Sequence, residues 1–498
     1  MMDDRRFDLV MEEELADLPL PDADAAETTP WKRAMSRIVW GIGLTTCTLN
    51  FLYLNYLLPA IGVVLLVLGF RTLRKENRWF AVCWGISIYQ VASKFVNLVL
   101  NATLWQPPET LTPWMWLTLG IPLIQYLCLW KGIREVRRAA GQPDEAGAAA
   151  GLAVWYVALC ALAIMKVSGW LFGLPLIVVY FLILRNLYRM SALLDGAGYQ
   201  VRAAQVRVSE TAAWIGWFVA LVAGVLLAGF LFGRYPMEWT PRESGEQAGL
   251  EEIRDHLMDL GFPDYVLDDL TVEDLAQCEG AIKVTVESKD RPMNAGRKVS
   301  ERRAYGTHAY TTYDVNELKV TTVVVALSEY QSIAFHHFLW QEEPDRRGME
   351  CIRIATQWCD QNSYRMNATQ LSYTLSGRVL CDRDGEVYTS PFYSLGREDY
   401  TSESWFFGAE DRSDVFAEYS HPRDGERCRG YIAYHIQCHV DNAAYGYSIL
   451  DFVHQRSWLN YPARTPKEHR QSGGFRDETF WVTQHDTMVY LVASEPAE

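Results

Sequence analysis

The sequence predicts an α-helical membrane domain followed by a soluble, all-β domain of the sandwich or jelly-roll type. Two observations predict it. Long apolar segments fill the first 233 residues, whereas from Ala281 onward apolar and polar residues alternate with a period of two. Such alternation is what half-buried strands require, whereas continuous apolar segments are typical of spans through lipid.

Charge changes at the same place in the chain. Up to Gly233 there are 19 Lys and Arg against 17 Asp and Glu, and after it 27 against 44. The two parts therefore carry +2 and −17, which sum to the net charge of −15. Because so acidic a domain repels a polyanion, we expect no nucleic-acid partner.

The first 30 residues are predicted to be an acidic cytosolic tail. Phe7, Val10, Met11, Leu15 and Leu18 fall at helical spacing, so residues 7–18 could form one short amphipathic helix. Such a helix would offer its apolar face to a cytosolic protein partner. A frayed, solvated tail is the alternative.

Residues 31–233 are predicted to be a multi-pass transmembrane domain of about seven apolar helices. A helix needs ~20 apolar residues to cross ~30 Å of hydrocarbon. The first two segments are short, and Asn55 and Pro59 interrupt them, which suggests either a hairpin of two short helices or a re-entrant element. The segments are 38–54, 57–70, 80–100, 113–130, 152–167, 170–184 and 212–233.

The loops predict the orientation, because short cytoplasmic loops retain Lys and Arg. Basic residues occur in alternate loops, and the intervening turns at 53–56, 101–112 and 168–170 have none. We therefore expect the N-terminus inside and the C-terminal domain outside a cytoplasmic membrane. The basic residues are Lys32, Arg33, Arg37, Arg71, Arg74, Lys75, Arg78, Lys131, Arg134, Arg137, Arg138, Arg185, Arg189, Arg202 and Arg207.

The third apolar segment carries a polar stripe at steps of three or four residues, which places its members on one helix face. Polar groups in lipid are costly, so this face should turn toward other helices or a wet cavity. The stripe is either interhelical glue, with Lys94 reaching the outer surface, or a ligand or ion site. Its members are Gln90, Ser93, Lys94, Asn97 and Asn101, with Gln125 on another segment as a partner.

The soluble part begins with a helical collar at residues 240–280, predicted from the spacing of Leu250, Ile253, Leu257 and Leu260 and from a capping pattern at Thr271. Residues 281–498 form the predicted extracytoplasmic β-rich domain of some ten short strands. The pair 384–385, Asp-Gly, is a strong hairpin signal within it.

Six cysteines lie in this part of the chain. In an oxidising compartment they permit up to three disulfides, and we expect one or two, because cysteine also serves as a small apolar residue. The candidates are Cys278, Cys351, Cys359, Cys381, Cys428 and Cys438.

No familiar catalytic, cofactor or metal motif occurs, so no cofactor and no metal site are predicted. His435 and His439 on one strand would lie ~13 Å apart, too far to share an ion. The sequence therefore favours a binding or sensing protein with an unknown outer ligand, active in signalling or in the cell envelope, and without turnover. A transporter that uses the polar stripe, and an outer-face hydrolase that uses paired carboxylates, are the alternatives.

Overall fold

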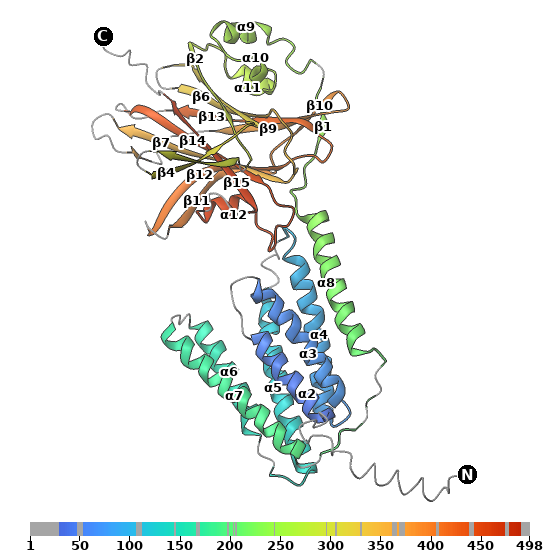
Figure 1. Ribbon diagram of the computed structural model, residues 1–498. Helices are drawn as coiled ribbons and strands as arrows, with labels where there is room; N and C mark the ends of the chain where they lie inside the picture. Colours follow the sequence, from blue (N-terminus) through green and yellow to red (C-terminus); the bar gives the residue numbers. More distant parts are fainter. Residues whose placement is uncertain are drawn as a thin grey trace, which may run out of the picture. The chain divides into compact units, whose positions relative to one another are not determined.

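Two structural units make up the chain in the computed structural model (Figure 1). The helical unit comprises Met1–Val99 and Gln106–Gly224, and the β unit comprises Leu100–Trp105 and Val225–Glu498. The structure describes residues 29–46, 53–105, 112–143, 146–165, 170–196, 199–202, 204, 207–243, 245–294, 296–303, 306–328, 331–360, 366–367, 374–404, 408–437, 443–473 and 478–489. The predicted docking helix at residues 7–18 lies outside these ranges.

Five helices of the described chain are long and apolar enough to cross a membrane: α3, α4, α6, α7 and α8. The expected count of about seven spans is not supported. α2 has only 17 residues and carries three basic residues within its first eight. α5 carries four basic residues in its last nine. The helix bounds are α2 Pro30–Thr46, α3 Leu54–Leu73, α4 Arg78–Leu100, α5 Thr112–Ala139, α6 Gly147–Ile164, α7 Trp170–Gly196 and α8 Glu210–Phe232.

The interrupted stretch at residues 38–70 is an antiparallel hairpin of α2 and α3. Gly62 packs against Gly41 and Gly69 against Ala34, so closely that a Cβ at either Gly62 or Gly69 would lie 2.9 Å from a backbone oxygen of the other helix. Small residues allow this close helix approach. Pro59 lies in the second turn of α3, where it removes one N–H donor, and the helix continues past it to Leu73.

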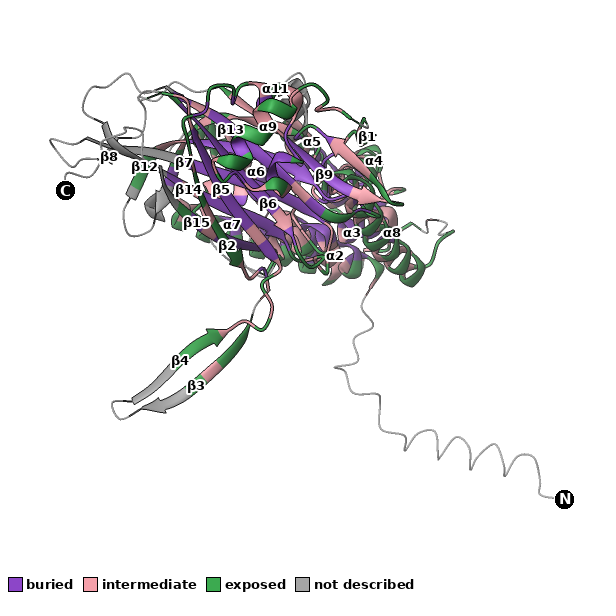
Figure 2. Ribbon diagram, turned by 90° about the horizontal axis from the view of Figure 1, so that it is seen from above, coloured by how far each residue is buried: buried purple, intermediate pink, exposed green. Residues whose placement is uncertain are grey.

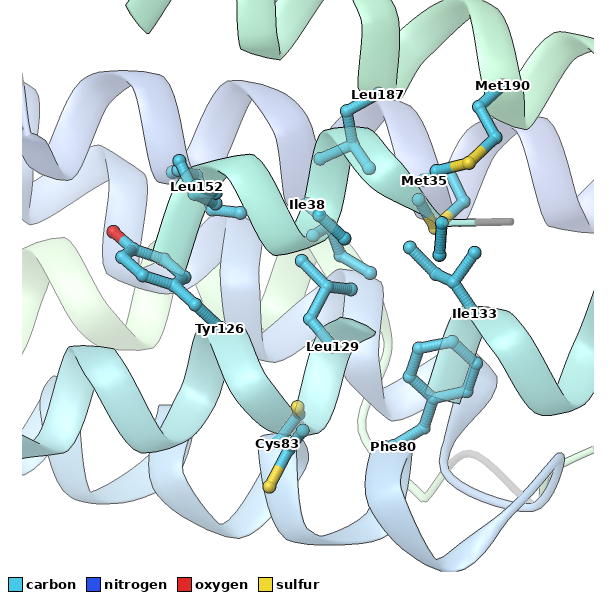
Figure 3. Packing of buried hydrophobic residues seen from close by; sticks show 14 of the residues in the cluster. Met35, Ile38, Phe80, Cys83, Tyr126, Leu129, Ile133, Leu152, Leu187 and Met190 are labelled. Atoms are coloured by element: carbon cyan, nitrogen blue, oxygen red, sulfur yellow. The ribbon is translucent and has the colours of Figure 1, made fainter. Parts of the chain in front are cut away.

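Buried side chains from α2, α3, α4, α5, α6 and α7 form one apolar core, part of which is drawn in Figure 3. The labelled side chains in Figure 3 are Met35, Ile38, Phe80, Cys83, Tyr126, Leu129, Ile133, Leu152, Leu187 and Met190.

The basic loops of the helical unit gather at one end. Arg37 pairs with Glu210 at 2.6 Å, which joins the start of α2 to the start of α8. Arg71, near the end of α3, donates to the Val208 carbonyl at 2.8 Å, and Trp79, at the start of α4, donates to Glu135 of α5 at 2.8 Å. The chain segments that carry the basic residues therefore share one end of the helical unit.

The β unit contains two large antiparallel sheets. The seven-stranded sheet has the order β1 (Thr240–Pro241), β10 (Glu386–Ser390), β9 (Leu375–Arg383), β13 (Glu426–Gln437), β6 (Gln331–Trp340), β5 (Leu318–Ala326) and β2 (Lys283–Arg291). The six-stranded sheet has the order β11 (Ser394–Ser404), β12 (Gly408–Ser420), β7 (Met349–Asp360), β14 (Ala443–Gln455) and β15 (Phe480–Val489), and β8 (Met366–Asn367) pairs with β7. A separate hairpin of β3 (Arg297–Arg303) and β4 (Gly306–Thr312) projects from them (Figure 2).

The two large sheets form a sandwich. Alternate side chains, such as Ile352 and Ile354 of β7 and Ala334 and Phe338 of β6, meet in one buried cluster between the sheets. The strands run longer than sequence periodicity indicated. The predicted turn between β9 and β10 is present, with positive φ at Asp384 (52°) and Gly385 (84°).

The helical collar is a layer on the outer face of the seven-stranded sheet. Its helices are α9 (Glu251–Asp259), α10 (Asp264–Leu267) and α11 (Val272–Ala276). Leu257, Leu267 and Leu275 of the collar are buried in one cluster with Phe335 and Tyr431 of the sheet. The collar therefore completes the β unit rather than serving as a spacer. On the outer face of the other sheet lies α12 (Pro466–Gln471).

Candidate functional site

Part of the predicted polar stripe is used in helix packing. Gln90 of α4 donates to Oε1 of Gln125 at 2.8 Å, and Gln125 of α5 donates to the Ser87 hydroxyl at 3.0 Å. Ser87 in turn donates to the Cys83 carbonyl at 2.8 Å. These side chains hydrogen-bond to one another across the two helices, as interhelical hydrogen bonds in lipid do, and one acceptor, Gln90 Oε1, has no partner.

The other stripe residues do not share that contact. Ser93, Lys94 and Asn101 are half-buried, and Asn97 is exposed. The stripe is thus divided into a bonded part near Gln125 and a part that faces outward from the packed helices. Its role as a ligand or ion site stays a prediction.

The cysteines whose side chains are described behave as small buried residues. Cys278, Cys351, Cys381 and Cys428 are free thiols and buried. Burial raises the pKa of Cys278 to about 12, which keeps the thiol protonated and unreactive. The side chains of Cys359 and Cys438 lie outside the described ones, and the expectation of one or two disulfides stays a prediction.

A second set of polar side chains lies inside the β-sandwich. Across β12, β7 and β14, the residues Tyr419, Glu350 and His454 occupy directly paired register positions. Paired residues on one face have Cβ atoms ~5 Å apart, so these three side chains form a row. His421 follows β12, and its N–H donates to the Gly348 carbonyl at 3.3 Å, which keeps it beside β7.

The row brings one carboxylate and two imidazoles together; we call Glu350, His421 and His454 the Glu–His–His cluster. His454 Nδ1 lies 2.5 Å from Glu350 Oε1, and His421 Nε2 lies 2.9 Å from the same oxygen. The three donor atoms lie within 4.8 Å of one another. All three residues are buried, and only the side chain of His454 retains some exposure, at 6%.

Several polar atoms of this cluster have no hydrogen-bond partner. They include Glu350 Oε2, both ring nitrogens of His421 and the Tyr419 hydroxyl. His421 Nε2 lies close to Glu350 Oε1, but the geometry between the two atoms does not meet that of a hydrogen bond. A buried polar group without a partner destabilises a fold by about 1–3 kcal/mol, so several in one place require an explanation.

The walls of the cluster are aromatic. Trp340 of β6, from the opposite sheet, makes edge contacts with His421 and His454 at ring-centroid distances of 5.6 and 5.1 Å. Tyr419 lies 5.6 Å from the His421 ring. The cluster is therefore buried and enclosed by aromatic side chains between the two sheets.

Electrostatics keeps the carboxylate charged. Burial alone would raise the pKa of Glu350, but the charges of His454 and His421 outweigh burial and hold that pKa below its ordinary value. Burial, with the Glu350 charge added, raises the pKa of Tyr419 well above its usual range. An ionised carboxylate thus lies beside a neutral phenol.

The cluster adjoins the segment that leaves α8. Arg234 donates to the His421 carbonyl, Tyr235 N–H donates to the Ser420 hydroxyl at 3.0 Å, and the Tyr235 hydroxyl donates to Glu418. Thr240–Pro241 then pairs with β10 as an edge strand. The linker is therefore bonded to the β unit from its first residues.

Sequence reasoning missed this cluster because its members are remote along the chain. Glu350 and His454 are 104 positions apart and meet only through strand pairing. One signal could have been used. Glu350 and His454 each share a strand face with an apolar residue two positions away, Ile352 and Phe452 respectively. Two imidazoles and a carboxylate are a donor set that zinc and other first-row divalent ions accept.

No protein-family model matches the sequence, and no curated protein matches it. Among solved structures, a heparinase III gene product with methylated lysines aligns with 85% of this chain and 73% of its own, at 7% sequence identity and a TM-score of 0.16. A TM-score this low supports no statement about fold or function.

Proposed function

We propose that the chain is a multi-pass protein of a cytoplasmic membrane, with an outward β unit that binds a ligand and passes its state to the membrane helices. Five helices suited to spanning a membrane support the membrane part. In the same proposal, a cytosolic protein that binds residues 7–18 receives the signal on the inner side of the membrane.

The orientation rests on the gathered basic end of the helical unit. Lys and Arg are retained on the cytoplasmic side, so this end is inside. α4 and α8 both start there with Arg78 and Glu210, and they end together, because Leu104 N–H donates to the Phe232 carbonyl at 3.2 Å. The chain that follows Phe232 is then outside.

The observation that carries the sensing role is the bonded linker after α8. Arg423, in the turn after β12, donates to the Phe230 carbonyl at 3.0 Å and stacks over the Phe230 ring at 4.1 Å. With the Arg234 and Tyr235 bonds, the last turn of α8 is tied to the segment 420–423. A ligand that shifts this segment shifts the end of α8 with it, and a flexible linker would not transmit such a shift.

The two alternatives have less support. A transport path through the polar stripe is disfavoured at Gln90 and Gln125, which bond one another rather than line an open route. An outer-face hydrolase would use a pair of water-accessible carboxylates, and the fully buried Glu350 is not suited to be one of them. We therefore retain binding without turnover.

A reporter enzyme that is active only outside the cytoplasm tests the orientation. Fused after Glu498 it should be active, and fused after Arg138 it should be silent. The reverse pattern would overturn the outward placement of the β unit.

Amide hydrogen exchange in the full-length protein tests the relay. In Arg423→Ala, the backbone of residues 230–241 should exchange faster than in the wild type, because two contacts to Phe230 are lost. Arg412→Ala is the matched control, since this exposed arginine pairs with Glu410 on its own strand. If both variants exchange like the wild type, α8 is not held by this segment.

A further inference from the structure

We propose that Glu350, His421 and His454 bind one divalent transition-metal ion, with zinc as the ion best suited to the ligands. The proposal names a ligand for the outward domain described above, but it stands on the geometry of the β unit alone. It therefore holds or fails independently of the membrane orientation.

The distances suit coordination. Zinc binds imidazole nitrogen and carboxylate oxygen at ~2.0–2.2 Å, which places neighbouring ligand atoms ~3–3.6 Å apart. His421 Nε2 and His454 Nδ1 lie 2.9 and 2.5 Å from Glu350 Oε1, and the three donor atoms lie within 4.8 Å of one another, so an ion among them requires side-chain shifts of about 1 Å.

The atoms without partners favour an ion over a hydrogen-bonded trio. In the metal-free trio Glu350 Oε1 forms a hydrogen bond with His454 Nδ1, whereas His421 Nε2, Glu350 Oε2 and the Tyr419 hydroxyl have no hydrogen-bond partner. An ion held by His421 Nε2 would lie along the in-plane lone pair of that nitrogen, which does not have to point at Glu350 Oε1. Glu350 Oε2 or the Tyr419 hydroxyl would then supply the fourth ligand.

The ligand set also predicts the kind of site. Because the residues are buried under Trp340, the coordination is closed by protein groups, which is typical of structural or sensory sites rather than catalytic ones. The His421 Nδ1 atom has no second bond to orient the ring. A hydrogen bond from the second ring nitrogen of a ligating histidine raises metal affinity about 10- to 100-fold. Because His421 lacks this bond, we expect the ion to bind reversibly rather than permanently.

His421 links the ion to the membrane side of the proposal. Its side chain is a ligand and its carbonyl accepts from Arg234. An ion that fixes His421 therefore fixes the segment 420–423 and the linker after α8. This consequence rests on the proposed function, whereas the binding itself does not.

Metal titration of the full-length protein in detergent, stripped with a chelator, tests the inference. The wild type should bind one Zn²⁺ per chain by calorimetry, and its Tm should rise with zinc concentration. Co²⁺ should give visible absorption bands of a nitrogen and oxygen site. Glu350→Gln and His454→Ala should each lower the affinity at least 100-fold.

His336→Gln is the matched control, because His336 is another buried histidine of the same sandwich and bonds to Thr322 and Ser448. It should bind zinc like the wild type. Glu350→Gln preserves size and hydrogen bonding, so its circular dichroism should match that of the metal-free wild type. Failure of the wild type to bind, equal binding by Glu350→Gln, or thiolate bands with Co²⁺ would each overturn the proposal. A result in which zinc binds but exchange at residues 230–241 is unchanged would instead remove the relay.

Discussion

Two buried polar clusters of this protein differ in one respect. In the helical unit, Gln90, Gln125 and Ser87 bond to one another, both NH₂ groups and the Ser87 hydroxyl donate across or along the helices, and one acceptor, Gln90 Oε1, has no partner. In the β unit, the Glu–His–His cluster has equally short contacts but leaves several donors and acceptors without partners.

The difference separates packing from binding. A cluster whose members satisfy one another gains nothing from a ligand, and its removal should affect stability alone. A cluster with unpartnered atoms is incomplete, so a ligand stabilises it and its removal in the ligand-free protein should have little effect. The predictions below compare variants of the two kinds.

Arg353→Leu should have the largest effect. Arg353 of β7 is buried and bonds to Asp414 and Asp451 at 2.6 Å each. Breaking a buried ion pair leaves uncompensated charges, so we expect a loss of about 3–5 kcal/mol in the free energy of unfolding. Denaturant unfolding of the full-length protein measures it.

Glu350→Gln is the comparison for Arg353→Leu, since both change one buried charge on β7. Without metal we expect the free energy of unfolding of this variant to change far less than that of Arg353→Leu. An equal loss in the two variants would mean that the Glu–His–His cluster is as complete as the ion-pair network.

Acid should destabilise the β unit through two buried histidines, His336 and His485. Burial, with the charge of His485 added, lowers the pKa of His336 to about 3, and burial lowers the pKa of His485 to about 4. Unfolded histidine titrates near 6.5. As pH falls from 6.5 toward 3–4 the unfolded chain binds more protons, so the free energy of unfolding falls.

Thermal melts between pH 7 and pH 4 measure this loss. His336→Gln should show a smaller fall in Tm over that range than the wild type, because one of the two titrating groups has gone. A variant whose Tm falls as steeply as that of the wild type would exclude His336 as a cause.

Gln125→Leu should lower the stability far less than Arg353→Leu does. It leaves Gln90 and Ser87 without their partner, and an interhelical bond in lipid is worth ~0.6 kcal/mol on average, with a maximum near ~1.7. Asn97→Leu is the matched variant, since Asn97 is exposed on the same helix as Gln90. We expect its Tm in detergent to equal or exceed that of the wild type. A larger loss in Asn97→Leu would assign the outward part of the stripe a packing role.

Local patterns predicted much of the fold. The Thr271 cap forms, with the Asp274 N–H donating to its hydroxyl at 3.2 Å, and the turn at Asp384 and Gly385 is present. Periodicity gives no clear strand signal where a strand carries charge on both faces, as in β11 and β12. In β15 the polar residues 484–486 interrupt the apolar pattern within one continuous strand.

The candidate site could not be predicted in the same way. A metal site was rejected at His435 and His439 on strand spacing, but such spacing says nothing about histidines on different strands. Glu350 and His454 meet through the β7–β14 register, which depends on the whole sheet. Tertiary pairing, rather than any local motif, creates the cluster.

X-ray absorption at the zinc edge of the zinc-loaded, full-length protein tests the central claim most directly. The account predicts a first shell of nitrogen and oxygen only, at about 2.0–2.2 Å, with the outer scattering of two imidazoles. Because Cys351 lies next to Glu350 in the sequence, a sulfur neighbour is the alternative that matters. A sulfur shell at about 2.3 Å, or the scattering of no imidazole, would contradict the assignment of Glu350, His421 and His454.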